Sequence, residues 1–181
     1  MRAVFGADAM SSGKVYFLGE ELHVKEPKDA VKKGLGYLAE DRKSLGLLVN
    51  QSIKVNTTLT ALKKVASHGF IRRKYENQQV EALLKKMSTR YGGLNDDVNS
   101  LSGGNQQKIS FAKWIWADCK CVIFDEPTRG VDVGAKVEIY EIINRLAEQG
   151  TAVIIVSSEM TEIIGTCDRA SSCHRAGSLE I

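Results

Sequence analysis

The sequence predicts an α/β protein with a parallel sheet covered on both faces and a separate helical lobe. Two unbroken apolar runs, residues 121–124 and 152–156, are typical of strands buried on both faces. Between them, residues 139–146 carry apolar side chains at helical spacing, which favours a strand–helix–strand unit with parallel strands. Residues 55–87 show helical spacing throughout, which predicts the lobe.

The first part of the chain predicts two strands and one short helix. Residues 15–18 and 35–38 are apolar runs of strand length, and residues 29–33 between them suit a helix. We therefore expect residues 1–44 to contribute to the sheet.

The middle of the chain predicts two helices, whose apolar side chains recur every three or four positions. These residues are Val55, Leu59, Leu62 and Val65 in the first helix, and Val80, Leu83, Leu84 and Met87 in the second. We expect Gly92 to end the second helix. The lobe is assigned to residues 45–105.

The last part of the chain, residues 106–181, alternates between helix and strand. Ile109, Ala112 and Trp116 mark a helix that precedes the strand at 121–124, and the helix at 139–146 leads to the strand at 152–156. All three parts are expected to form one domain.

Composition excludes several classes of function. Lys and Arg number 25 against 22 Asp and Glu, and a net charge of +3 does not suggest binding to nucleic acid. The apolar runs are far shorter than the roughly 18 residues of a membrane span. The spacing of the four cysteines fits no zinc template.

Two adjacent carboxylates, Asp125 and Glu126, follow the strand at 121–124. The carboxyl ends of strands are where open α/β sheets bind ligands. Alternation along the strand directs the two carboxylates differently, so that one can reach Mg²⁺ and the other a nucleophilic water. A polar exit from the strand is an equally good explanation of these two residues taken alone.

A second motif, residues 101–108, opens the helix that contains Ile109. Ser102, Gly103 and Gly104 at a helix start allow backbone N–H groups to approach an anion closely, and the helix dipole favours a phosphate there. Alternatively, Ser102 is a simple N-cap. The order of the two motifs, with Asp132 after the second, favours the phosphate interpretation.

These motifs resemble the ATP-binding cassette (ABC) family, whose signature motif reads LSGGQ and whose Walker B strand ends in Asp-Glu-Pro. Residues 101–108 resemble the signature, and residues 122–125 resemble Walker B. Residues 37–43, 125–136 and 156–160 resemble more narrowly the second cassette of tandem-cassette sugar importers of the ribose, xylose or galactose type.

The resemblance implies an ABC-type P-loop NTPase that uses ATP and Mg²⁺ to drive monosaccharide import. It implies that Asp125 holds Mg²⁺, that Glu126 is the catalytic carboxylate, and that Glu40 occupies the Q-loop position beside the metal. Asp132 and Ser158 would couple two sites. The residues that would contact the γ-phosphate of a nucleotide on a second cassette are Ser102, Gly103, Gly104 and Gln106.

The resemblance also implies partners and a location. A second cassette would pair head to tail with this one, and membrane permease subunits would dock between residues 40–42 and the lobe at 56–64. A sugar-binding protein outside the membrane would act through the permease, and no nucleic acid is expected. The chain would lie in the cytoplasm, on the inner face of the plasma membrane.

The sequence departs from the family in three places. It contains no Gly-x-x-x-x-Gly-Lys-Ser/Thr motif, so we expect that the Walker A strand and loop are missing, that Met1 is an internal methionine of a longer chain, and that the isolated chain is inactive. Ser158 stands where most cassettes have a histidine. Residues 170–181 lack the expected apolar strand.

Two alternatives to a sugar-importer ATPase remain. The first is a cassette remnant that acts only as an interaction module. The second is a DNA-repair or chromosome-maintenance ATPase, which shares the LSGG and Asp-Glu motifs. The second is disfavoured because such proteins place long coiled coils where this chain has roughly sixty residues.

Overall fold

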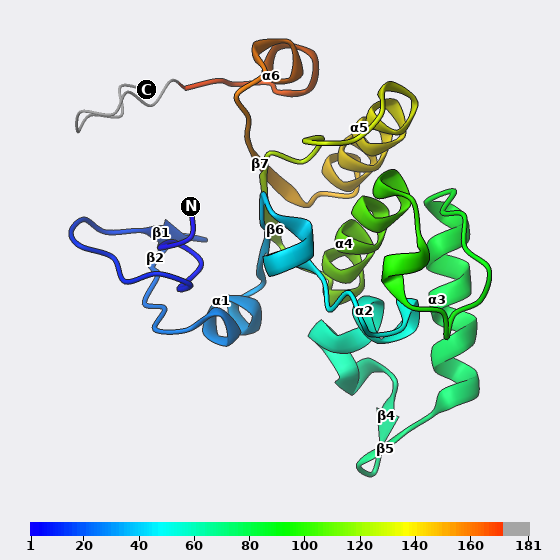
Figure 1. Cartoon of the computed structure of the whole chain (residues 1–181). Helices are drawn as coiled ribbons and strands as arrows, with labels where there is room; N and C mark the ends of the chain where they lie inside the picture. Colours follow the sequence, from blue (N-terminus) through cyan, green and yellow to red (C-terminus); the bar gives the residue numbers. More distant parts are fainter. Residues whose placement is uncertain (172–181) are drawn as a thin grey trace.

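A three-stranded parallel sheet forms the centre of the molecule in the computed structural model, which describes residues 1–171 (Figure 1). Its strands are β3 (Leu35–Leu38), β6 (Cys121–Asp125) and β7 (Ala152–Val156), in the order β3-β6-β7. Tyr37 pairs with Ile123, and Ile123 pairs with Ile154. The parallel sheet predicted from the apolar runs is confirmed.

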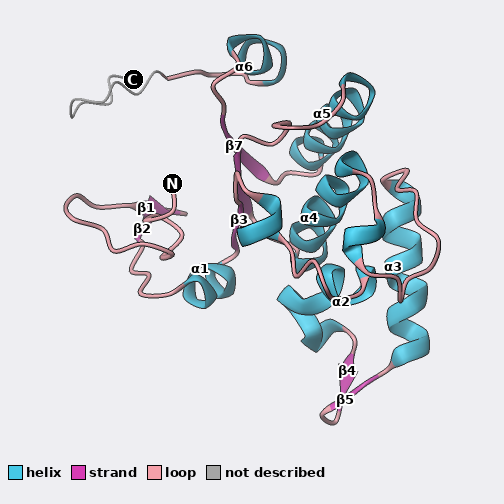
Figure 2. Cartoon of the chain, viewed as in Figure 1, coloured by secondary structure: helices cyan, strands magenta, loops and turns pink. Residues whose placement is uncertain are grey.

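Two helices, α4 (Gly103–Ala117) and α5 (Val133–Glu148), cover one face of this sheet (Figure 2). The ring of Phe111 on α4 stacks on that of Phe124 on β6, with centroids 4.5 Å apart. A Cβ at Gly36 on β3 would lie 3.0 Å from the Trp114 ring, so this close contact with α4 needs a glycine. The helix-facing core is therefore continuous from β3 to β6.

The other face of the sheet is covered only in part. An N-terminal segment with a small hairpin, β1 (Tyr16–Phe17) and β2 (Glu20–Glu21), and the helix α1 (Pro27–Lys33) lie beside β3. Phe5 packs against Tyr37 on this face, with ring centroids 5.4 Å apart. Beyond β6 the cover ends, and Ile154 on β7 remains 41% exposed. The prediction of cover on both faces thus holds for β3 and β6 alone.

The helical lobe is more broken than its apolar spacing predicts. It contains the turn η1 (Arg42–Gly46), α2 (Ile53–Thr58), the 3₁₀ helix η2 (Leu59–Lys64), the hairpin β4 (Ala66–Ser67) and β5 (Phe70–Ile71), α3 (Arg73–Lys86) and the short turn η3 (Val98–Ser100). Ala61 has non-helical backbone angles (φ −143°, ψ 51°), which interrupt the helix in the first predicted segment. The second helix ends at Lys86, where Ser88 adopts a positive φ of 50°, and not at Gly92.

The last helix within residues 1–171 is α6 (Met160–Thr166). Among residues 1–171, no helix is long and apolar enough to cross a membrane. The expectation that residues 170–181 lack a strand falls mostly outside the described residues.

Lys113 joins α4 to the turn η1 and carries a testable pH dependence. Its ammonium group donates to the Gly46 carbonyl at 2.6 Å and lies 4.9 Å from the centre of the Trp114 ring. Burial lowers the pKa of Lys113 to about 8 from its ordinary value of 10.5. Between these two values Lys113 is protonated in the unfolded chain and largely neutral in the folded chain, so its contribution to the free energy of unfolding rises with pH.

We expect Lys113→Met to flatten this rise between about pH 8 and pH 10.5, since it removes the titrating group. Urea unfolding at several pH values measures the slope. Lys85→Met, at an exposed position of α3, is the control and should leave the slope unchanged. Equal slopes in the wild-type chain and Lys113→Met would contradict the prediction.

Candidate functional site

Asp125 ends β6 at the carboxyl edge of the sheet, where the sequence places a ligand site. One of its oxygens, Oδ2, accepts a hydrogen bond of 2.6 Å from the hydroxyl of Tyr37 on β3. Burial, together with this bond, raises the pKa of Tyr37, so the phenol stays protonated and remains a donor. Tyr37 therefore orients Asp125 and leaves its second oxygen for a ligand. Sequence analysis missed Tyr37, because its role depends on the register of two strands.

Glu126 follows in a left-handed backbone conformation, with φ of 49°. Its N–H donates to the Val156 carbonyl at the end of β7, at 2.8 Å. Its Oε1 accepts from the backbone N–H of Ser158, also at 2.8 Å. A non-glycine residue at positive φ is a strained conformation of the kind found at functional sites. The structure thus fixes the Glu126 carboxylate, and Ser158 contributes its backbone to this contact.

The start of α4 leaves its backbone donors available. Ser102 stands at the N-cap position, yet its side chain makes no capping bond. Its hydroxyl instead accepts from the Asn105 amide at 2.9 Å, and Asn105 Oδ1 accepts from the backbone N–H of Arg90. Ser102 is thus the N-cap residue by position, without the side-chain capping bond that the N-cap interpretation expects. Backbone N–H groups that no side chain caps at a helix start suit an anion.

Gly104 has a packing role that the sequence analysis did not foresee. A Cβ at this position would lie 2.7 Å from the Ala135 methyl carbon and 3.6 Å from Asp132 Oδ2, so glycine permits the starts of α4 and α5 to touch. Asp132 caps α5 by accepting from the Ala135 N–H at 3.0 Å. The two motifs are thereby joined in space, whereas the predicted contact of Gly104 with a nucleotide finds no exposed surface, because Gly104 is buried.

Gln106 does not lie where the prediction needs it. It is 4% exposed, and its amide donates to the Leu101 carbonyl at 3.0 Å. A side chain buried within its own chain cannot reach a nucleotide on another molecule, so the structure is at odds with this assignment. Gln106 precedes Ile109 by three positions, a helical spacing that places it on the core face. Asn105, which is half-buried and beside Ser102, is the better candidate.

Glu40 and the signature region are linked by two arginines. Glu40 forms an ion pair with Arg129, on the loop that follows β6. Arg42 donates to the Arg129 carbonyl at 3.2 Å, and its guanidinium lies next to Gly103, where a Cβ would be 3.0 Å away. These contacts surround a cavity of about 340 Å³ that also contacts Asp41 and Lys43. The metal role of Glu40 stays a prediction, since its carboxylate is paired with Arg129.

These residues can hold Mg²⁺ only together with ligands from a bound nucleotide and water. Within the described part of the chain, no group of three or more His, Cys, Asp or Glu side chains could hold a metal ion. Mg²⁺ bound with a nucleotide needs only one or two carboxylates, the phosphates and water, and the free oxygen of Asp125 meets that need. ATP itself fits incompletely, because the sequence has no glycine-rich loop with a lysine to hold its phosphates.

Comparisons with known proteins agree with this arrangement. Residues 1–129 match the family described as ABC transporter. The chain is 46% identical over 168 residues to the ribose import ATP-binding protein RbsA of Chelativorans sp. (strain BNC1), covering 93% of this chain and 33% of that protein. It is also 46% identical over 174 residues to RbsA of Bacillus subtilis (strain 168), covering 96% of this chain and 35% of that protein.

The fold is likewise shared with solved cassettes. A dimeric ATP-binding cassette in a post-hydrolysis state, bound to ADP and Pi, superimposes with a TM-score of 0.73 at 20% identity, covering 88% of this chain and 68% of that chain. The chain spans about a third of the length of the curated relatives it matches. It belongs to the ABC transporter family and has the α/β fold of an ABC-type P-loop NTPase cassette.

Proposed function

We propose that this chain forms the Walker B and signature part of an ATPase that drives monosaccharide import. The observation that carries the proposal is the pair Asp125 and Glu126 at the end of β6, each carboxylate held by a specific donor. The names of the relatives, which are ribose import ATP-binding proteins, support the substrate class.

The two carboxylates have different tasks in this proposal. Asp125 would hold Mg²⁺ with the oxygen that Tyr37 leaves free, where the ion would supply charge neutralisation for the phosphates. Glu126, oriented by the Ser158 N–H, accepts a proton from the attacking water. Ser102 and the backbone N–H of Gly103, at the start of α4, stabilise the phosphate of a nucleotide held by the opposite cassette.

The partners follow from this arrangement. A second cassette places its signature motif opposite the site of Glu126. The signature motif of this chain, which contains Ser102, faces the site of the second cassette. Permease subunits dock near residues 40–42 and 56–64. The side chain of Asn56 is buried and hydrogen-bonded to the Leu48–Ser52 loop, so it does not contact the permease. A sugar-binding protein acts through the permease, and the whole lies on the inner face of the plasma membrane.

A non-catalytic interaction module is the second candidate. A chimaera distinguishes the two. In it, the strand and Gly-x-x-x-x-Gly-Lys-Thr loop of an ATP-hydrolysing cassette precede Met1. The partner is an intact cassette whose catalytic glutamate is replaced by glutamine, so that hydrolysis reports on Glu126. Hydrolysis supports the ATPase, and none at saturating ATP supports the module.

The unmodified chain should bind Mg-ATP more weakly than about 10 μM, because Asp125 and Ser102 add to a phosphate site that a lysine and backbone amides first create. Calorimetric titration measures this affinity, with the chimaera as the positive control. Saturable binding tighter than about 10 μM by the unmodified chain would show that these residues suffice.

A further inference from the structure

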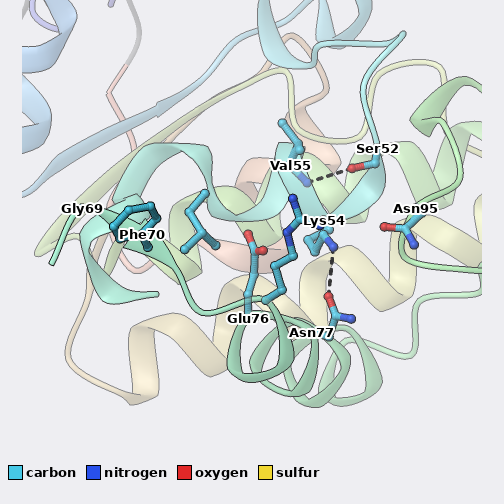
Figure 3. Close-up of a pocket in the computed structure, with 10 residues that line it drawn as sticks. Ser52, Lys54, Val55, Gly69, Phe70, Glu76, Asn77 and Asn95 are labelled. Carbon is cyan, nitrogen blue, oxygen red and sulfur yellow. Dashed lines mark hydrogen bonds between the residues drawn. The ribbon is translucent and has the colours of Figure 1, made fainter. Parts of the chain in front are cut away.

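A pocket of about 720 Å³ lies in the helical lobe, between α2, the β4–β5 hairpin and the start of α3 (Figure 3). It is a separate feature from the candidate nucleotide site, with which it shares no lining residue. Its volume is in the range of pockets that bind ligands or anchoring side chains. Figure 3 shows Phe70 at one end and Asn95 at the other, with Lys54 and Glu76 between them.

One wall of the pocket is apolar and projects into solvent. The hairpin turns through His68 and Gly69, both at positive φ (49° and 83°), and pairs Ser67 with Phe70. This two-residue turn sets the direction of Phe70, which is 80% exposed, and of Ile71, which is 46% exposed. Val55 of α2 lies across the pocket from them. An exposed aromatic side chain beside a hollow marks an interaction site more often than an isolated one does.

The rim of the pocket is cationic. Lys54 donates to Asn77 at 3.0 Å, and Arg73 is a second cationic residue that lines the pocket. Arg73 belongs to the exposed basic run Arg72-Arg73-Lys74, in which Arg72 stacks over the Tyr75 ring.

The acidic residue that lines the pocket, Glu76, is 5% exposed and accepts from the Thr58 hydroxyl at 2.8 Å. The carboxylate of Glu76 is thus buried and hydrogen-bonded, and the solvent-accessible charges among the lining residues are positive.

We propose that this pocket binds an acidic segment of a partner protein, which places an apolar side chain against Phe70 and a carboxylate between Lys54 and Arg73. Charge complementarity selects the acidic chemistry, and the basic run steers the encounter. The exposure of Phe70 selects a protein over a small ligand, because a molecule confined to the hollow would leave this ring in water. Aromatic and arginine side chains are those that dominate the energy of protein interfaces.

The probe is a short, fluorescein-labelled helical peptide of Leu and Glu, with leucines at helical spacing on one face. Its anisotropy is measured against the full chain. We expect saturable binding tighter than about 100 μM that weakens with salt. Matched peptides with Lys for Glu, or with Ser for Leu, should bind at least about tenfold more weakly. Failure of the Leu-Glu peptide to bind, or equal binding of the Lys peptide, overturns the proposal.

Variants locate the binding on the chain. Arg73→Glu and Phe70→Ser should each weaken peptide binding about tenfold or more. Lys85→Glu makes the same charge change at an exposed position farther along α3, and should change binding less than about twofold. Equal losses in Arg73→Glu and Lys85→Glu would show diffuse charge attraction and overturn the proposal.

A lipid membrane is the alternative binding partner for a hairpin with exposed basic and aromatic side chains. Phosphatidylserine vesicles are therefore tested by co-sedimentation. Vesicle binding that depends on Phe70, without binding of the Leu-Glu peptide, would replace the proposed protein partner by a membrane.

Discussion

We expect the replacement of Glu126 by glutamine to lower ATP turnover at the proposed site about 100-fold or more and to leave nucleotide binding unchanged. The amide keeps the size of the side chain and can still accept from the Ser158 N–H, as the carboxylate does at 2.8 Å. It cannot accept a proton from the attacking water, which is the step assigned to this residue. Turnover and nucleotide affinity are measured separately in the chimaera paired with the inactivated cassette.

Glu148→Gln is the matched control, because Glu148 ends α5 and is exposed to solvent. It makes the same chemical change and should leave turnover within about twofold. If Glu126→Gln also left turnover unchanged, hydrolysis at this chain's site would not depend on the Glu126 carboxylate, because the partner's site is already inactivated. The proposed role of Glu126 as proton acceptor would then be wrong.

The strands at 35–38, 121–124 and 152–156 could be predicted from the sequence, because unbroken apolar runs leave few alternatives to buried strands. The run at 15–18 was expected to join the same sheet and instead forms a separate hairpin with residues 20–21. The pair Asp125 and Glu126 followed directly, since residues at a strand end lie at a sheet edge. The bond between Tyr37 and Asp125 could not be predicted. Tyr37 and Asp125 are 88 positions apart in the sequence, and their bond depends on the strand register that pairs Tyr37 with Ile123.

The error at Gln106 has a different origin. The resemblance to the signature motif compares residues in sequence order, whereas the helix places these residues on two different faces. Ser102 and Asn105 lie three positions apart and contact each other, while Gln106 shares the core face with Ile109. Helical phase was available in the sequence and would have selected Asn105.

Breaks in the helical lobe were beyond such reasoning. Apolar side chains at positions 55, 59, 62 and 65 fit a continuous helix, and each is compatible with the kinked arrangement observed. The hairpin that follows is fixed by two left-handed residues, of which only Gly69 is a conventional signal. Phe70 follows this turn and belongs to no helical or strand periodicity, so the sequence pattern does not indicate its exposure.

The largest loss of stability is expected for Phe124→Ala. Phe124 is fully buried in the central strand β6, where its ring stacks on Phe111 of α4 and its backbone pairs with Leu38 and Ile155. Because strands on both sides and a helix above hold the site open, the structure cannot collapse into the space left by the ring. The free energy of unfolding should fall by about 3–5 kcal/mol, a large part of the roughly 5–15 kcal/mol typical of a domain.

Urea unfolding followed by circular dichroism measures this loss against two variants. Phe124→Leu keeps most of the buried volume and should lose less than about 1.5 kcal/mol. Phe70→Ala removes the same atoms from a side chain that is 80% exposed and should change stability by no more than about 0.5 kcal/mol. Equal losses at Phe124 and Phe70 would mean that the sheet is not the centre of the folded chain. A loss confined to Phe124 identifies the strand that carries Asp125 and Glu126 as the element on which both the fold and the site depend.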